Sequence, residues 1–286
     1  MTNNKLLLIL LTIVSLGFTA CSSGEKSKST MTSDAGSVSM LKDERPLNLT
    51  IYLDLSDRLL KNKVSEQMES DTTIIDYLFE NIFLGKCKKS ILKSKDHFQI
   101  FFYPAPAQSD INQLSTALNL DLSKFNAPQK KEKSKEFQST YKQNVEAIYQ
   151  RALTEKKYIG SDIWGFFSNK KVDVQCVRPG NRNVLVILTD GYIFHQDNKV
   201  KEGNTYSYVL DQTLAIPGSS LIVKRDGLED LEVLVLEVNP TSPKLHDRLY
   251  SVLEEWFGGM GVNKVQIAET DVTANTIAVI NNFFAE

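Results

Sequence analysis

Short apolar runs alternate with longer amphipathic segments along the chain from Leu47 onwards. The runs LNLTIYLDLS, HFQIFFYPAP, NVLVILTDGYIF and LEVLVLEV are rich in aliphatic, aromatic and β-branched residues, as buried strands are. Four consecutive aliphatic residues at 184–187 predict that the third of these runs is the central strand. A shorter strand within 107–130 and the run KVQIAE are expected at the edges of the sheet.

Apolar residues recur at helical spacing in the segments between the strands. Asp71 or Thr72 can act as N-cap of the first helix, and a further helix is expected to start after Ser161. Ser242 and Pro243 are suited to be the N-cap and first residue of another. The helices are therefore expected over 72–90, 134–158, from 162 onwards, 243–257 and 272–284.

Strands that alternate with helices of this length predict an α/β fold: an open, mostly parallel sheet with helices on both faces, as in Rossmann-like domains. Ligands of such sheets bind beyond the carboxyl ends of the strands. The polar residues that end the strands at 47–56 and 183–190 are therefore expected on one surface. The long polar connection at 195–227 is expected to form part of that surface.

The first 20 residues have the features of a signal peptide. After Lys5 come 13 uncharged residues, LLLILLTIVSLGF, which are too few to span a bilayer permanently. Thr19 and Ala20 before Cys21 resemble the lipobox of bacterial lipoproteins, which implies a lipid on Cys21 and a place in the bacterial cell envelope, outside the cytoplasm. An uncleaved membrane anchor is the alternative.

Residues 21–46 are rich in Ser, Lys, Thr and Gly, which predicts a flexible tether. The remaining residues, 47–286, are then one domain of ordinary size, which the 42% content of hydrophobic residues is enough to give a core. Lys and Arg number 33 against 35 Asp and Glu, so the chain lacks the basic excess of a nucleic-acid-binding protein.

The three cysteines and three histidines show neither CxxC nor HxxxH spacing, so a zinc site is not expected. Cys87 near the end of the first helix and Cys176 just before the central strand are both expected near the amino-terminal edge of the sheet. Since export permits oxidation, these two residues could form a disulfide.

Three polar segments are expected at the carboxyl edge: DLSDR at 54–58, GSD at 160–162 and TDG at 189–191. Together they resemble the metal-ion-dependent adhesion site of von Willebrand factor A domains, which combines DxSxS with a Thr and an Asp from two further loops. The resemblance covers about residues 47–286. It matches Asp54 and Ser56 to the first two positions, Ser161 to the Thr and Asp190 to the last Asp, and so implies Mg²⁺ or Mn²⁺ ligands.

Arg58 departs from this pattern, because it stands where the second serine belongs. A guanidinium cannot bind a cation and repels it, so metal binding is expected to be weak or absent. Turned inward, Arg58 could pair with Asp54 or Asp190 and replace the cation. Turned outward, it would leave two close carboxylates that a divalent ion could bridge.

The two aspartates could instead cap helices or loops, and Ser161 with Asp162 could simply start a helix. The leading hypothesis is a membrane-tethered extracytoplasmic module that binds an envelope or extracellular protein through these loops. A metal-dependent hydrolase or phosphatase using Asp54 is the alternative, although DxDxT, GxSxG, P-loop and HExxH motifs are absent from the sequence. An inert structural component of an envelope assembly is a third possibility.

Overall fold

The computed structural model describes residues 43–286 except 57, 59–63, 89, 105–108, 155–160, 192–198, 203–204, 209–224, 240–242, 270–271 and 286. The predicted signal peptide, Cys21, nearly all of the tether and His195 lie outside these residues. Within the part of the chain that is described, no helix combines the length and apolar character needed to cross a membrane.

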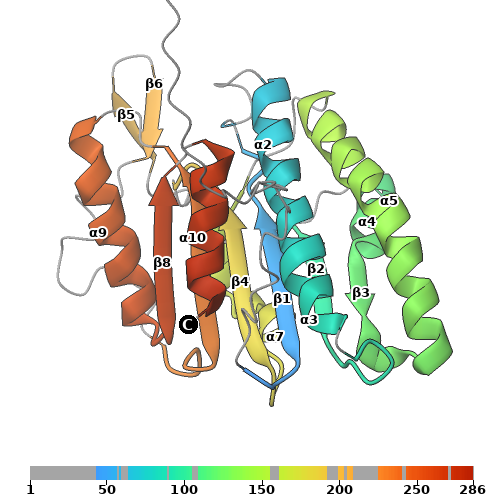
Figure 1. The fold of residues 1–286 in the computed structure, drawn as a ribbon. Coiled ribbons are helices and arrows are strands. Elements are labelled where there is room, and N and C mark those ends of the chain that lie inside the picture. The colour runs from blue at the N-terminus through green and yellow to red at the C-terminus, as the bar shows by residue number, and fades with distance from the viewer. Residues whose placement is uncertain are drawn as a thin grey trace, which may run out of the picture. The chain divides into compact units, whose positions relative to one another are not determined.

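Six strands form one sheet in the order β3-β2-β1-β4-β7-β8 (Figure 1). Every neighbouring pair is parallel except β2 and β3, which are antiparallel. The mostly parallel α/β sheet predicted from the sequence is therefore confirmed. Its strands are β1 (Leu47–Leu53), β2 (His97–Phe101), β3 (Asn119–Asp121), β4 (Arg182–Leu188), β7 (Leu231–Val238) and β8 (Lys264–Glu269).

Helices cover both faces of this sheet, and each face has its own apolar core. In Figure 1, α2, α3, α5 and α10 lie on one side, and α7 lies behind β1 and β4. The helices of the first face are α2 (Val64–Tyr77), the π-helical segment η1 (Leu78–Phe83), α3 (Leu84–Cys87), α4 (Ser109–Ala117), α5 (Ala127–Thr154) and α10 (Thr273–Ala285). Those of the second are α6 (Ile163–Ser168), α7 (Lys171–Cys176) and α9 (Pro243–Gly259).

The central strands supply side chains to both cores, because successive residues of a strand point to opposite faces. In β1, Ile51 and Leu53 belong to the first core and Tyr52 to the second. Strands β4 and β7 alternate in the same way. Among the described residues both cores lie within 47–284, so a chain that begins at Ser22 keeps every residue of these cores.

Two helices begin earlier than their apolar periodicity predicts. Helix α2 starts at Val64 and α5 at Ala127, because the first turns of both are built from polar residues. Asp71 therefore lies inside α2 and is not its N-cap, which corrects the sequence-based expectation. The polar connection after β4 also contains a hairpin of β5 (Lys199–Glu202) and β6 (Thr205–Tyr208) that the pattern did not predict.

The predicted disulfide between Cys87 and Cys176 is wrong, since both thiols are free and buried. Cys87 packs in the first core and Cys176 in the second, so the sheet separates them. The sequence places both residues at the amino edge, but it does not show on which face each helix lies. The pKa of both thiols is raised, mainly because the thiols are buried.

Candidate functional site

The candidate site lies where the carboxyl ends of β1, β4 and β7 meet. The sheet order makes the gap between β1 and β4 the point where the connections turn to opposite sides, which is where ligands of such sheets bind. The backbone N–H of Asp54 donates to Leu188 O (3.0 Å), and that of Thr189 donates to Leu236 O (3.1 Å). These bonds carry the strand pairing past the last strand residues and bring Asp54 and Thr189 together.

Asp54 is fully buried, and both of its carboxylate oxygens accept hydrogen bonds. The hydroxyl of Thr189 donates to Oδ2 (2.6 Å), and the backbone N–H of Ser56 donates to Oδ1 (2.9 Å). The second bond closes an Asx turn immediately after β1. Asp54 thus has the loop-capping geometry that the sequence left open beside its resemblance to a metal ligand.

The loop after β4 is fixed by short-range contacts. Gly191 N donates to the Thr189 hydroxyl (3.1 Å), and Asn239 N donates to the backbone oxygen of Asp190 (3.1 Å). Gly191 has a φ of 96°, and an added Cβ would lie only 2.9 Å from a methyl carbon of Leu249. Only glycine fits this turn without strain.

Ser161 contacts the side of β1 that faces α6. Its Oγ lies 2.8 Å from the Tyr52 hydroxyl, which itself donates to Tyr103 O (2.8 Å). Since the single phenolic proton goes to that carbonyl, Ser161 donates to Tyr52. Asp162 accepts from Gly165 N (2.7 Å) as the N-cap of α6. Ser161 therefore contacts Tyr52 and not Asp54.

Arg58 turns inward, but its partner differs from the one expected. Its side chain is only 2% exposed, and Nη2 lies 2.5 Å from Oδ2 of Asp71 in α2. Nε donates to the backbone oxygen of Asp54 (2.8 Å). The carboxylate that binds Arg58 is thus that of Asp71, which the sequence did not indicate, while the charges of Asp54 and Asp190 also raise the pKa of Arg58.

Asp71 is the centre of a buried polar network between α2, α5 and β7. The Tyr149 hydroxyl donates to Asp71 Oδ2, and Gln67 Nε2 donates to Oδ1 (2.9 Å). Gln67 Nε2 also lies 3.3 Å from Oε2 of Glu237. Glu237 has a φ of 68° where the register of β7 against β8 shifts. This irregularity aims a carboxylate from the end of β7 at the network.

The electrostatics of the network follow from its burial. Burial raises the pKa of Glu237, and the charge of Asp71 raises it further. Burial also raises the pKa of Tyr149, which therefore stays a neutral donor. Burial alone would lower the pKa of Arg58, but nearby negative charges, led by that of Asp71, reverse the direction. Arg58 is thus a permanent cation inside the protein.

These residues fit a divalent cation poorly. Among the described residues, no three His, Cys, Asp or Glu side chains are grouped as a metal-ligand set. Both oxygens of Asp54 already accept hydrogen bonds, and the hydroxyl of Ser161 is bonded to Tyr52. The charge of Arg58 also lies against the backbone of Asp54.

The sequence placed Thr189 at this edge without predicting its hydrogen bond to Asp54, and it did not place Gln67, Asp71, Tyr149 and Glu237 in this region at all. Two of them do have a signal. Asp71 precedes Ile74 and Ile75 by three and four residues, and Tyr149 follows Val145 by four, so both lie on apolar helical stripes. A charged residue on a buried stripe predicts a buried partner, although the stripe does not identify it.

No protein-family model and no curated protein matches the chain. Two solved structures of the pilus adhesin SpaC from Lactobacillus rhamnosus GG are similar to it, one of them in an open conformation. The first is 11% identical with a TM-score of 0.43, and covers 86% of this chain and 31% of the adhesin. The second is 14% identical with a TM-score of 0.41, and covers 85% and 30%. The chain thus spans about a third of the adhesin's length, and so distant a likeness carries no argument about function.

Proposed function

We propose that this chain is an extracytoplasmic binding module of the von Willebrand factor A type, held at a bacterial membrane by lipid on Cys21. It recognises a protein of the envelope or outside the cell through the loops at the carboxyl edge of the sheet. It needs neither a metal ion nor a nucleic acid. The observation that carries the proposal is Asp54, fully buried with both oxygens hydrogen-bonded, beside the internal cation Arg58.

This geometry favours binding over hydrolysis. A nucleophile or general base has to reach the substrate. Asp54 has no exposed surface, and its hydrogen bonds to Thr189 and Ser56 hold two loops together. A carboxylate used in this way fixes the residues with which these two loops begin. Positions that are fixed before binding lose less conformational entropy when a partner binds.

Arg58 supports the metal-independent part of the proposal. In the resembling adhesion sites, a divalent cation balances the carboxylates of the loops. Here a guanidinium buried against Asp71 and the Asp54 backbone supplies positive charge to the same end of β1. The charge is covalently part of the chain, so chelators cannot remove it.

The test is retention of proteins from a membrane extract by the chain that begins at Ser22. Ser56 is partly exposed and Asn239 is exposed at the carboxyl edge, so S56R with N239R blocks the proposed surface. S139R with T140R is the matched control, because it adds the same charge to exposed positions of α5. We expect wild type and the control to retain the same protein and the edge variant to lose it.

Equal retention by all three chains would contradict recognition through the carboxyl edge. A wild type that retains nothing more than an unrelated domain would favour the inert structural role. Retention should be equal in EDTA and in Mg²⁺, and loss in EDTA that Mg²⁺ restores would overturn metal independence. The attachment is checked in the source cells, where C21S should leave the membrane fraction or accumulate as precursor.

A further inference from the structure

We propose that the turn at residues 86–95, at the amino edge of the sheet, contacts the surface of a bilayer with anionic headgroups. Its sequence, KCKKSILKSK, holds five lysines and no acidic residue. It lies at the opposite edge from the candidate site, because it precedes β2 directly. The inference rests on the membrane attachment proposed above, but it does not depend on recognition of a protein through the carboxyl edge.

The turn presents an apolar residue between exposed lysines. Lys88, Lys93 and Lys95 are exposed, and the side chain of Leu92 is 54% exposed. Large apolar side chains with this exposure are few among the described residues: Leu92, Val174 and Val272. Basic residues around an exposed aliphatic side chain are the composition of segments that lie in a membrane interface.

The backbone of the turn is held rigidly, so Leu92 does not simply fold back on the core. The buried Lys130 of α5 donates to Ser94 O (2.7 Å) and lies 3.4 Å from Leu92 O. Ser94 N donates to Ser90 O (3.0 Å). A fixed turn pays little ordering entropy on contact with a surface.

Acidic residues near the turn weaken its positive field only in part. A hollow of about 210 Å³ beside it is lined by Lys86, Lys93 and Lys95, and by Glu44 and Asp96. Asp96 is buried and accepts from Leu47 N (2.6 Å) and the Ser94 hydroxyl. Its carboxylate is therefore hydrogen-bonded inside the fold. Glu44 is then the exposed acidic residue of the hollow.

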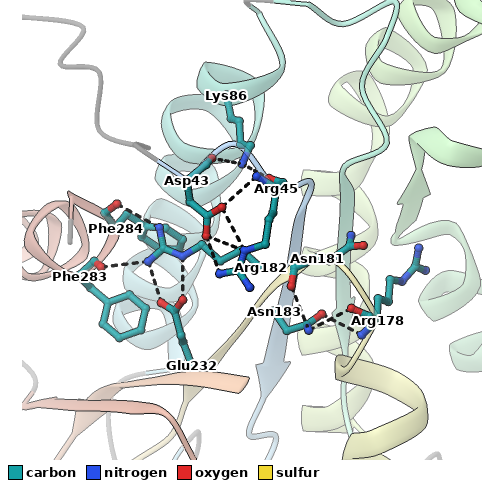
Figure 2. A network of polar contacts seen from close by, with 10 residues as sticks. All are labelled: Asp43, Arg45, Lys86, Arg178, Asn181, Arg182, Asn183, Glu232, Phe283 and Phe284. Atoms are coloured by element: carbon teal, nitrogen blue, oxygen red, sulfur yellow. Dashed lines mark hydrogen bonds and ion pairs between the residues drawn. The ribbon is translucent and has the colours of Figure 1, made fainter. Parts of the chain in front are cut away.

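The chain enters the folded unit beside this turn. Lys86 Nζ donates to the backbone oxygens of Asp43 (2.9 Å) and Arg45, as Figure 2 shows. An attachment through the residues before 43 would therefore join the folded unit at this edge and not at the carboxyl edge. That placement is why we assign the turn to a bilayer rather than to a soluble anion.

Flotation with lipid vesicles tests the proposal on the chain that begins at Ser22, which keeps every residue of the two cores. K88Q with K93Q removes two charges from the turn. K170Q with K171Q removes two exposed charges from the connection between α6 and α7 and is the matched control. Each lysine near an anionic surface contributes about fivefold in affinity, so the turn variant should bind roughly 25-fold more weakly.

Wild type should float with vesicles of equal parts phosphatidylcholine and phosphatidylglycerol, and not with phosphatidylcholine alone. The control pair should stay within about twofold of wild type, since it belongs to the connection between α6 and α7, on the other face of the sheet. L92S should weaken binding while leaving its salt dependence unchanged, because it removes apolar contact and no charge. Circular dichroism of each variant establishes that it is folded.

Equal losses in the two lysine pairs, equal binding to neutral vesicles, or no binding by wild type would each overturn the proposal. One further outcome reassigns the turn. If vesicles are not bound but immobilised polyglutamate is, and K88Q with K93Q abolishes that, the partner is an acidic protein and the membrane proposal is wrong.

Discussion

Arg58 shows how a single residue alters the meaning of a motif. It occupies a position where the resembling adhesion sites have a hydroxyl, yet its guanidinium reaches past Asp54 to Asp71 in α2. Taking two charges out of water is costly unless further hydrogen bonds satisfy them. Tyr149 and Gln67 supply those bonds to Asp71, and the Asp54 backbone supplies one to Arg58. The buried charges of Arg58 and Asp71 are therefore stabilised only when these hydrogen bonds are present together.

Removing one charge of the pair Arg58–Asp71 should destabilise the protein far more than replacing both charges with apolar side chains. R58M leaves Asp71 charged and buried, and should lower the free energy of unfolding by about 3–5 kcal/mol; D71L should do the same by stranding Arg58. The double variant should be much less destabilised than the sum of the two, because no uncompensated charge remains. Urea unfolding of the four chains measures this cycle.

The exposed pair between Arg45 and Asp43 provides the control for that cycle. Arg45 is about half exposed, so R45M should change the free energy of unfolding by about 1 kcal/mol or less. Additive losses in the Arg58 and Asp71 variants would show that the two charges are not coupled, against the structure.

The sequence could predict the residues of this region that stand at the ends of β1 and β4, but not those that come from α2 and from the end of β7. Asp54 and Asp190 stand at strand ends, and the rule that parallel strands end at one edge is enough to place them. Asp71 lies 13 residues beyond Arg58 within a helix, and Glu237 belongs to a different strand. Their convergence depends on helix docking and on the β7 irregularity, which no local pattern encodes.

At the scale of elements, a row of polar side chains crosses the sheet near its amino edge. Asn48 of β1 is paired in register with His97 of β2 and with Asn183 of β4. Asn48 Nδ2 donates to Cys176 O (2.7 Å) and to Asn183 Oδ1 (2.8 Å). Its Oδ1 therefore faces His97 Nδ1, 2.6 Å away, which assigns the proton to that ring nitrogen.

This row explains the register of β2, β1 and β4, because a slip by one residue would bury unpaired amides. The sequence predicted these strands well from their apolar runs. It did not identify the polar row, since single Asn and His residues inside such runs have no distinctive spacing. The helix starts were missed for a related reason: in α2, buried Gln67 and Asp71 interrupt the apolar period.

His97 should make folding stability depend on pH. Burial, followed by the charge of Arg178, lowers its pKa from 6.5 to about 4. The unfolded chain thus binds a proton between these values and the folded chain does not. Stability should be fully present above pH 6.5 and fall as the pH drops towards 4, by about 3 kcal/mol.

The measurement is the free energy of unfolding of wild type and H97Q across this pH range. Carboxylates also titrate there, so the difference between the two curves isolates the histidine. H97Q should be less stable at neutral pH, and the difference should shrink as the pH falls. Parallel curves would mean that His97 accepts a proton in the folded protein as readily as in the unfolded one.

At the scale of the whole molecule, the two edges of the sheet have different characters. The carboxyl edge holds the network around Asp71 and the proposed recognition loops. The amino edge is where the chain enters at Asp43 and where α10 ends against β4 (Figure 2). There Arg182 binds Glu232 through Nε (2.9 Å) and Nη2 (2.7 Å) and donates to the backbone oxygens of Phe283 and Phe284. This clamp fixes the last helix to the sheet, and the recognition and the attachment that we propose would then use opposite edges of that sheet.

The two buried thiols can show whether that unit opens as a whole. Cys87 reports on the first core and Cys176 on the second, and both are protected by burial. C87S and C176A, made in the chain that begins at Ser22, each leave one thiol for labelling. Because β1, β4 and β7 contribute to both cores, we expect the two thiols to react at the same rate and with the same dependence on denaturant as global unfolding.

Faster labelling of one thiol would show that its face of the sheet opens independently of the other. If wild type fails to label in denaturant without reductant, the two thiols are oxidised, against the structure.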